Sequence, residues 1–175
     1  PDEKDMFFFV GYLCSKMAFN FMRALNPTLN FQVENVGALP VLDDAKNKIQ
    51  GKVNKVVSEA VNISKKDWDS LETSWDFERI SLLQKENKTV DIVRSYVRYR
   101  ELCQLMTYQM KQLEEENNRI FIEAYGMQDE LTPDVPIEEI TLFANPHFRY
   151  KGDLTDDERE ARFKADTMKE LISYA

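Results

Sequence analysis

Apolar residues recur three or four positions apart along most of the chain, and this spacing predicts helices. The longest such run covers residues 90–125, which corresponds to a helix of roughly 50 Å. Helices of that length are typical of a bundle spine or a coiled-coil arm. Thr89 is the expected N-cap and Gly126 the expected C-cap. The apolar positions of this run are Val93, Tyr96, Val97, Leu102, Leu105, Met106, Met110, Leu113, Ile120 and Phe121.

Two helices are predicted in the first third of the chain. Residues 5–24 have the pattern of one buried helix, which ends at Asn26-Pro27 because proline cannot continue the hydrogen-bond ladder. A second helix is expected over about 43–61, with Asp43 or Asp44 as its N-cap. Its apolar stripe consists of Ile49, Val53, Val56, Val57 and Ala60.

Two capping boxes predict further helix starts. Residues 64–67 have the capping-box spacing and open a short helix, and residues 155–158 open the last one. Between these helices, residues 74–88 and 127–153 are predicted to be irregular.

A short alternating segment predicts a small amount of β structure. Leu29, Phe31 and Val33 alternate with Asn30 and Gln32, and a period of two indicates a half-buried strand over 29–33. Residues 36–41 are expected to form a second short strand that Pro40 ends or places at a sheet edge. The predicted fold class is therefore mainly α: a helical bundle with one long helix and a small β remnant near residues 29–42.

Composition agrees with one helical unit in a reducing compartment. The 175 residues are 43% hydrophobic, with only 5 Gly and 6 Pro, a mix that favours helix. Cys14 and Cys103 are an isolated pair, which indicates buried thiols and a cytoplasmic location rather than a disulfide framework. No apolar run reaches the roughly 18 residues of a membrane span, so no membrane partner is expected. The first residue is Pro1 and the last, Ala175, falls within a helical pattern, so we expect both ends to be cut from a longer chain.

The charge is acidic overall and unevenly distributed. The formal net charge is −8, which argues against an autonomous, strongly basic nucleic-acid binder. Residues 1–84 carry 10 basic and 12 acidic side chains, residues 85–111 carry 6 and 3, and residues 112–175 carry 7 and 16. A polyanionic partner is therefore expected to contact the first two-thirds of the chain.

Several short segments of the sequence resemble one protein family. Residues 26–33 run into 36–42, and residues 66–77 follow about thirty positions later. Together they resemble the region after the target-recognition segment of large adenine-specific DNA methyltransferases, most closely the PglX family of BREX phage-defence systems. Further similar phrases lie at 114–126 with 129–132, at 154–160 and at 169–175. The resemblance implies that residues 1–42 hold a helix and the end of a target-recognition segment, and that residues 43–175 form a helical spacer.

The resemblance also implies a function for the parent protein. Members transfer a methyl group from S-adenosylmethionine to the adenine amine of double-stranded DNA, and they have a bilobed shape that clamps DNA. Expected partners are DNA, the missing methyltransferase lobe and other defence-system proteins. We expect this fragment to contribute DNA recognition or lobe spacing rather than catalysis, with no cofactor of its own. The alternatives are a helical protein-interaction scaffold without DNA contact and an independent small enzyme.

No catalytic or metal-binding residue is assigned from the sequence. An adenine methyltransferase needs a glycine-rich loop and an Asn/Asp-Pro-Pro-aromatic turn that holds the flipped adenine. The nearest match to that turn is Asn145-Pro146-His147-Phe148, in which His147 replaces the second proline. We interpret it as a plain turn before Phe148 and Tyr150. His147 is the single histidine and there is no Cys-x-x-Cys, so a zinc site is not expected.

The candidate DNA-contacting residues are Lys48, Lys52, Lys55, Arg94, Arg98, Arg100 and Gln32. The three lysines fall at i, i+4 and i+7, on the helix side opposite the apolar stripe, and phosphate contacts require only a positive charge within reach. Arg94 and Arg98 are one turn apart on the long helix. A solvated helix face remains the alternative for both sets.

Aromatic residues near position 70 have two interpretations. Trp68, Trp75 and Phe77 have faces on which bases can stack. Their spacing favours a role in the core, where they would seal the short helix onto the long one.

Overall fold

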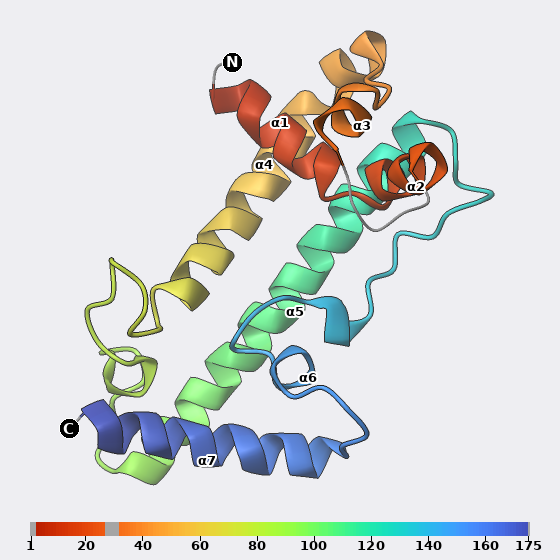
Figure 1. Cartoon of the computed structure of the whole chain (residues 1–175). Coiled ribbons are helices and arrows are strands. Elements are labelled where there is room, and N and C mark those ends of the chain that lie inside the picture. Colours follow the sequence, from red (N-terminus) through yellow and green to blue (C-terminus); the bar gives the residue numbers. More distant parts are fainter. Residues whose placement is uncertain (1–2, 27–31, 175) are drawn as a thin grey trace. The chain divides into compact units, whose positions relative to one another are not determined.

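The computed structural model describes residues 3–26 and 32–174, and every regular element in these ranges is helical. This confirms the mainly α fold class (Figure 1). The elements are α1 (Glu3–Leu13), α2 (Lys16–Leu25), α3 (Val33–Gly37), α4 (Asp43–Trp68), η1 (Ser81–Leu83), α5 (Ile92–Ala124), η2 (Ile137–Glu139), α6 (Pro146–Arg149) and α7 (Asp156–Tyr174).

The chain forms two compact units. Unit 1 consists of residues 1–61 and 112–135, and unit 2 consists of residues 62–111 and 136–175. The boundaries fall inside α4 and α5, so each unit contains part of both long helices. The expected division at residue 42, between a recognition segment and a spacer, concerns function and stays a prediction.

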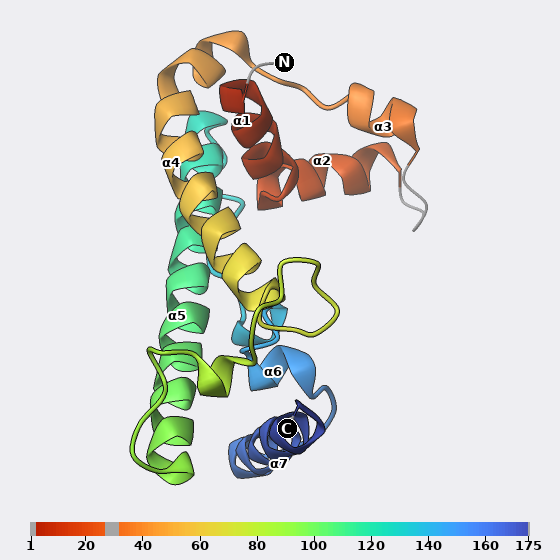
Figure 2. The same ribbon diagram turned by 90° about the vertical axis from the view of Figure 1, so that its left-hand side faces the viewer.

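Unit 1 is built around the contact of α1 with the N-terminal part of α4, which lie side by side in Figures 1 and 2. Gly11 allows this close approach, because an added Cβ would lie 2.7 Å from Val53 Cγ1 and 2.8 Å from Val57 Cγ2. Phe8 packs on Phe121 with 5.6 Å between ring centroids. The buried core residues are Phe8, Tyr12, Met17, Ala18, Met22, Leu39, Val53, Val57, Ile120 and Phe121.

The prediction of one helix over 5–24 is wrong at a single point, because the chain breaks between α1 and α2. Ser15 caps α2: its Oγ accepts from Ala18 N at 3.2 Å and donates to Tyr12 O at 2.6 Å. Two asparagines of α5 satisfy the backbone at this break. Asn117 Nδ2 donates to Gly11 O at 2.8 Å, and Asn118 Oδ1 accepts from Lys16 N at 2.9 Å.

The predicted β remnant near 29–42 is also corrected. Residues 27–31 lie outside the described residues, and the described part, 32–42, contains α3 and turns but no strand. Val33 is 85% exposed, so the apolar residue that ended the alternating pattern does not have the half-buried face that a strand requires. The second strand expected over 36–41 is replaced by the end of α3 and a turn.

Helix α4 starts where predicted and continues to Trp68, so the separate short helix expected to start at residues 64–67 and to run through Leu71 is not formed, and residues 64–68 belong to α4. Helix α5 confirms the long helix predicted over 90–125. Its N-terminal cap is Asp91, whose Oδ1 accepts from Arg94 N at 2.8 Å, rather than Thr89.

Gly126 ends α5 as expected, with φ +69°. Its N–H donates to Glu123 O and the N–H of Met127 donates to Ile122 O, the pattern of a Schellman motif. The capping box of α7 is confirmed too, since Thr155 Oγ1 accepts from Glu158 N and Thr155 N donates to Glu158 Oε2.

Unit 2 is organised around Phe163 of α7, which is fully buried. The ring stacks on Tyr99 of α5 at 6.0 Å and lies 5.1 Å from the guanidinium carbon of Arg100 and 5.7 Å from that of Arg149. Each arginine is paired with a glutamate of α7, because Arg100 Nε donates to Glu160 at 2.7 Å and Arg149 Nη2 to Glu170 at 2.8 Å. These contacts attach α7 to α5 and α6 through charge as well as apolar packing.

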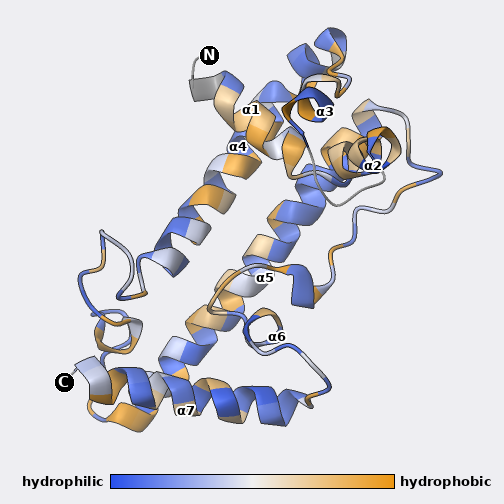
Figure 3. Ribbon diagram, in the orientation of Figure 1, coloured by the Kyte–Doolittle hydropathy of each residue, from blue (hydrophilic) through white to orange (hydrophobic). Residues whose placement is uncertain are grey.

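Hydrophilic and hydrophobic residues are interleaved along α4 and α5 (Figure 3). Across residues 3–26 and 32–174, no helix has the length and apolar character that crossing a membrane requires.

Candidate nucleic-acid interface

The face predicted from Lys48, Lys52 and Lys55 lies on α4 within unit 1, and all three side chains are exposed. Val53 and Val57, on the other side of the helix, are buried in the core. Seven residues of helix extend for roughly 10 Å, so the three ammonium groups follow one line along the surface. We call these three residues the lysine face.

The surroundings of the lysine face differ along its length. Lys48 lines a cleft together with Asp43, Asp44 and Ile49, so nearby carboxylates offset part of its charge. Within the described residues, no ion pair joins Lys52 or Lys55 to an acidic group. Lys52 and Lys55 therefore present the more effective positive charge to solvent.

The arginines lie on α5 within unit 2 and fall into two kinds. Arg94 and Arg98 are exposed, and Arg94 Nε lies 3.4 Å from Asp91 Oδ2. Arg100 is largely buried, with a 13% exposed side chain that pairs with Glu160 and covers Phe163. Burial acts to lower the pKa of Arg100, but the hydrogen bond and charge of Glu160 raise it on balance. Arg100 is thus engaged inside unit 2, whereas Arg94 and Arg98 remain open to solvent.

Gln32 precedes α3 and is exposed. Its backbone N–H donates to Asn35 Oδ1 at 3.0 Å, which fixes the start of the helix. Gln32 therefore lies at the start of a helix and not in the strand that was predicted over residues 29–33.

The Asn145–Phe148 motif forms the turn that we expected. Asn145 is fully buried, and its Nδ2 donates to Ile137 O at 2.7 Å and to Ile140 O at 2.9 Å. Its Oδ1 accepts from His147 N at 3.1 Å and so caps α6. Because these bonds use its donors and an acceptor, the amide is committed to holding the loop and not to binding a base.

The tryptophans contradict their predicted place in the core. Trp68 is 51% exposed and Trp75 is 100% exposed. Only Phe77 is half-buried, with its ring 6.0 Å from that of Tyr174. Base stacking by the tryptophans stays a hypothesis.

Unit 2 also has buried polar groups that the sequence reasoning did not single out. Asp67, near the end of α4, accepts from Phe143 N at 2.7 Å and from Ala144 N at 2.9 Å. Burial raises the pKa of Asp67 against the opposing effect of these N–H groups. Burial also raises the pKa of Cys103 to about 12 and that of Tyr99 well above its ordinary value. Of these buried polar groups, only Asp67 had been marked by a sequence motif, since it is the last residue of the capping box predicted over residues 64–67.

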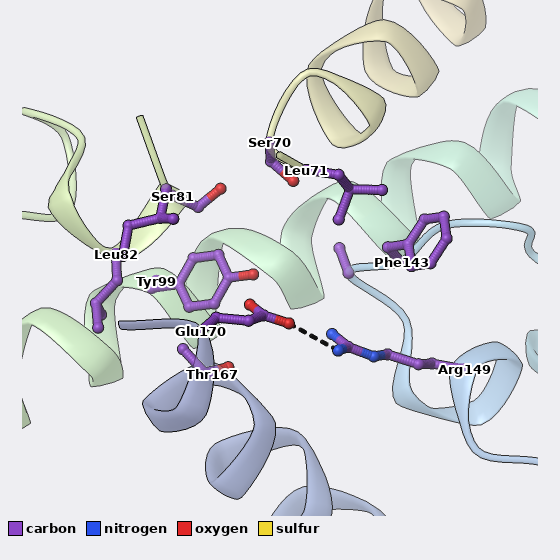
Figure 4. A pocket seen from close by; sticks show the side chains of 11 residues that line it. Ser70, Leu71, Ser81, Leu82, Tyr99, Phe143, Arg149, Thr167 and Glu170 are labelled. Carbon is purple, nitrogen blue, oxygen red and sulfur yellow. Dashed lines mark hydrogen bonds and ion pairs between the residues drawn. The ribbon is translucent and has the colours of Figure 1, made fainter. Parts of the chain in front are cut away.

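A small cavity in this region has a volume of about 20 Å³, and Figure 4 shows the side chains that line it. Tyr99, Ser81 and Leu82 line it beside the Arg149–Glu170 ion pair. Space for about one water molecule is too little for a substrate. Among residues 3–26 and 32–174 there is also no group of three His, Cys, Asp or Glu residues arranged to hold a metal ion.

Comparison with known proteins finds similarity to two adenine-specific methyltransferases. No protein-family model matches the chain. The chain is 31% identical over 174 residues to the adenine-specific methyltransferase BrxX of Escherichia coli O9:H4 (strain HS), which covers 99% of the chain and 14% of that protein. It is 28% identical over 144 residues to the adenine-specific methyltransferase PglX of Lacticaseibacillus casei (strain Zhang), covering 81% of the chain and 12% of that protein.

These matches confirm the resemblance to BREX-type, PglX-like methyltransferases. The chain corresponds to a segment of such proteins and spans about one-seventh of the length of the relatives it matches.

Proposed function

We propose that this chain serves as a non-catalytic segment of an adenine-specific DNA methyltransferase and that the lysine face contacts the phosphate backbone of double-stranded DNA. The alignment of nearly the whole chain with a methyltransferase supports the first part. The observation that carries the second part is the exposure of Lys48, Lys52 and Lys55 along one line of α4, without ion pairs to Lys52 or Lys55 among the described residues.

In this proposal, other parts of the complete methyltransferase carry out the methyl transfer. S-adenosylmethionine and the flipped adenine bind to those parts, and methylation serves phage defence. Asn145, the nearest candidate for a base-holding amide, already donates its side-chain hydrogen bonds to Ile137 O and Ile140 O. The segment therefore contributes to holding DNA or to spacing the lobes.

Fluorescence anisotropy with a labelled duplex tests the DNA contact. We expect salt-sensitive binding between about 50 mM and about 200 mM NaCl, since phosphate contacts release counterions. In the variant Lys48→Glu/Lys52→Glu/Lys55→Glu, binding should weaken, and the salt dependence should fall by about one unit of slope for each lysine that contacts a phosphate.

A matched control tests whether the change in net charge alone accounts for the loss of affinity. Arg79→Glu/Lys85→Glu/Lys88→Glu changes the charge by the same amount at three exposed positions in a different part of the sequence. The proposal predicts a much smaller loss of affinity for this control. Equal losses in both variants, or no loss in the lysine-face variant, would show that the lysine face does not contact DNA.

A second candidate function, a protein-interaction scaffold, is favoured by one observation. Helix α5 exposes apolar side chains within unit 2, namely Val93, Val97, Leu105 and Tyr108. Such positions are typical of contact surfaces when they follow one another along a helix. This alternative predicts no DNA affinity at low salt and a self-associating chain in sedimentation, which Val97→Glu/Leu105→Glu would convert to a monomer.

A further inference from the structure

Unit 2 contains an open cavity of about 450 Å³, larger than and adjoining the one in Figure 4. Its volume falls within the range of roughly 300–1,000 Å³ that small-molecule sites occupy. The lining comes from the end of α4, the segment 69–86, the middle of α5 and Ala144. All of these belong to one unit, so the cavity is complete within it.

One part of the cavity lining, which we call the floor, is mainly apolar. Ile63, Leu102, Cys103 and Met106 contribute to it together with Tyr99, and the buried Asp67 also lines the cavity. Because burial raises the pKa values of Cys103 and Tyr99, both groups are neutral near pH 7. Such a floor favours the hydrocarbon part of a ligand.

The rim of the cavity is acidic. Asp69, Asp76, Glu78 and Glu86 line it, against the single cation Lys66. Lys65 pairs with two of these carboxylates, at 3.1 Å from Asp69 and 2.6 Å from Asp76. Glu78 and Glu86 are exposed and have no ion pair within the described residues. The net charge at the rim therefore repels a phosphate and attracts a cation.

Two exposed aromatic side chains adjoin the rim in the sequence. Trp68 precedes Asp69, and Trp75 precedes Asp76. Lys65 forms ion pairs with both Asp69 and Asp76, so the two short stretches that carry the tryptophans are held together. Both tryptophans lie outside the lining of the cavity, so they can report on the rim segment but do not form the site.

We propose that this cavity binds an organic cation, an apolar stem carrying an ammonium or guanidinium group. The stem lies against the floor at Leu102 and Met106, and the charged head lies at the rim between Glu78 and Glu86. This site is independent of DNA binding by the lysine face, since its charge excludes a polyanion. The same chemistry is offered by a free polyamine and by an arginine side chain of a partner protein.

Titration of the 175-residue chain with n-butylguanidinium tests the site, followed by intrinsic tryptophan fluorescence and by calorimetry. The only two tryptophans, Trp68 and Trp75, directly precede the lining residues Asp69 and Asp76 in the sequence, so a fluorescence change reports on this segment, and calorimetry measures binding independently of it. Saturable binding is expected, with at least tenfold weaker binding of n-butylurea, a neutral molecule of the same shape. Equal binding of the two probes, or no binding of either, would overturn the proposal.

Variants locate the binding to the rim. Glu78→Gln/Glu86→Gln should weaken n-butylguanidinium binding by tenfold or more, while Glu138→Gln/Glu139→Gln, an exposed pair elsewhere in unit 2, should leave it unchanged. Both variants keep side-chain size, and circular dichroism verifies the fold. Unchanged affinity in the first variant would contradict the proposal.

Two further probes identify the source of the cation. Tighter binding of spermidine than of an N-acetylated, C-amidated arginine tetrapeptide supports the proposal with a free polyamine as the ligand. The reverse order supports it with a basic side chain of a partner protein. If neither binds more tightly than n-butylurea, the site does not recognise organic cations.

Discussion

Tyr12 and Tyr125 share one hydrogen-bond acceptor, the carbonyl oxygen of Pro40, at 2.8 Å and 2.6 Å. Their rings are stacked with centroids 6.0 Å apart and an interplanar angle of 11°. Tyr12 belongs to α1 and Tyr125 follows α5, so two distant parts of the sequence hold the same peptide group. Burial is the main cause that raises the pKa of Tyr12 far above its ordinary value. The end of the segment that resembles a target-recognition region is thereby fixed to the core of unit 1.

The shared acceptor predicts non-additive effects of removing the two hydroxyl groups. Tyr12→Phe should lower the free energy of unfolding by about 0.5–1.5 kcal/mol, and the more exposed Tyr125→Phe by less. The double variant should lose more than the sum, because Pro40 O then has no donor from either tyrosine. Urea unfolding of the four proteins measures this coupling. Tyr108→Phe, at an exposed site, is the control, and strict additivity would contradict the shared role.

Two glycines should respond in opposite directions to the same substitution. Gly126 has φ +69° with nothing within 4 Å of an added Cβ, so Gly126→Ala should cost about 1–2 kcal/mol through backbone conformation alone. Gly51 lies within α4 and also has nothing within 4 Å, so Gly51→Ala should stabilise by about 0.5–1 kcal/mol. Thermal and urea unfolding measure whether each substitution raises or lowers the stability. A loss of stability in Gly51→Ala would mean that residue 51 is not helical in solution.

Asp67 predicts a pH-dependent contribution to stability. Burial raises its pKa above the ordinary 3.8, so its contribution to stability is full below that value and declines as the pH rises through the folded-state pKa. Asp67→Asn cannot lose a proton and leaves one N–H of Phe143 or Ala144 without its acceptor, at a cost of about 1–3 kcal/mol.

The difference in unfolding free energy between the wild type and Asp67→Asn should therefore shrink as the pH increases from about 3.5 toward neutrality. Urea unfolding at a series of pH values measures it, with the exposed Asp153→Asn as control. A difference that grows with pH would show that the carboxylate form is the favoured one.

Long-period patterns made much of the fold predictable from the sequence. The limits of α5 were expected within two residues, because ten apolar positions and the glycine at 126 agree on one helix. The capping box of α7 was recognised since all its partners lie within four residues. The family resemblance was likewise recognised from short sequence segments, and similarity along the chain to BrxX and PglX confirms it.

Short patterns and distant partners were the source of the errors. The alternating pattern ended at Val33, which is the first residue of α3 and not part of a strand, and the apolar stripe continued through the break at Ser15. The local sequence predicted that Arg100 is an exposed cation, but its guanidinium pairs with Glu160, sixty residues later. The local sequence predicted that Trp75 is a core residue, yet its side chain is fully exposed. For Arg100 and Trp75 the deciding contact, or its absence, is not local in the sequence.

Both units are assembled from two stretches of chain that alternate along the sequence. During synthesis, a ribosome that has produced the first 111 residues of this sequence has therefore completed neither unit. Unit 1 becomes complete only with residues 112–135, and unit 2 only with residues 136–175, a delay on the order of seconds at usual translation rates. Throughout that interval the apolar side of α4 lacks its final neighbours, so it stays exposed for longer than the corresponding face of a domain formed from one continuous stretch.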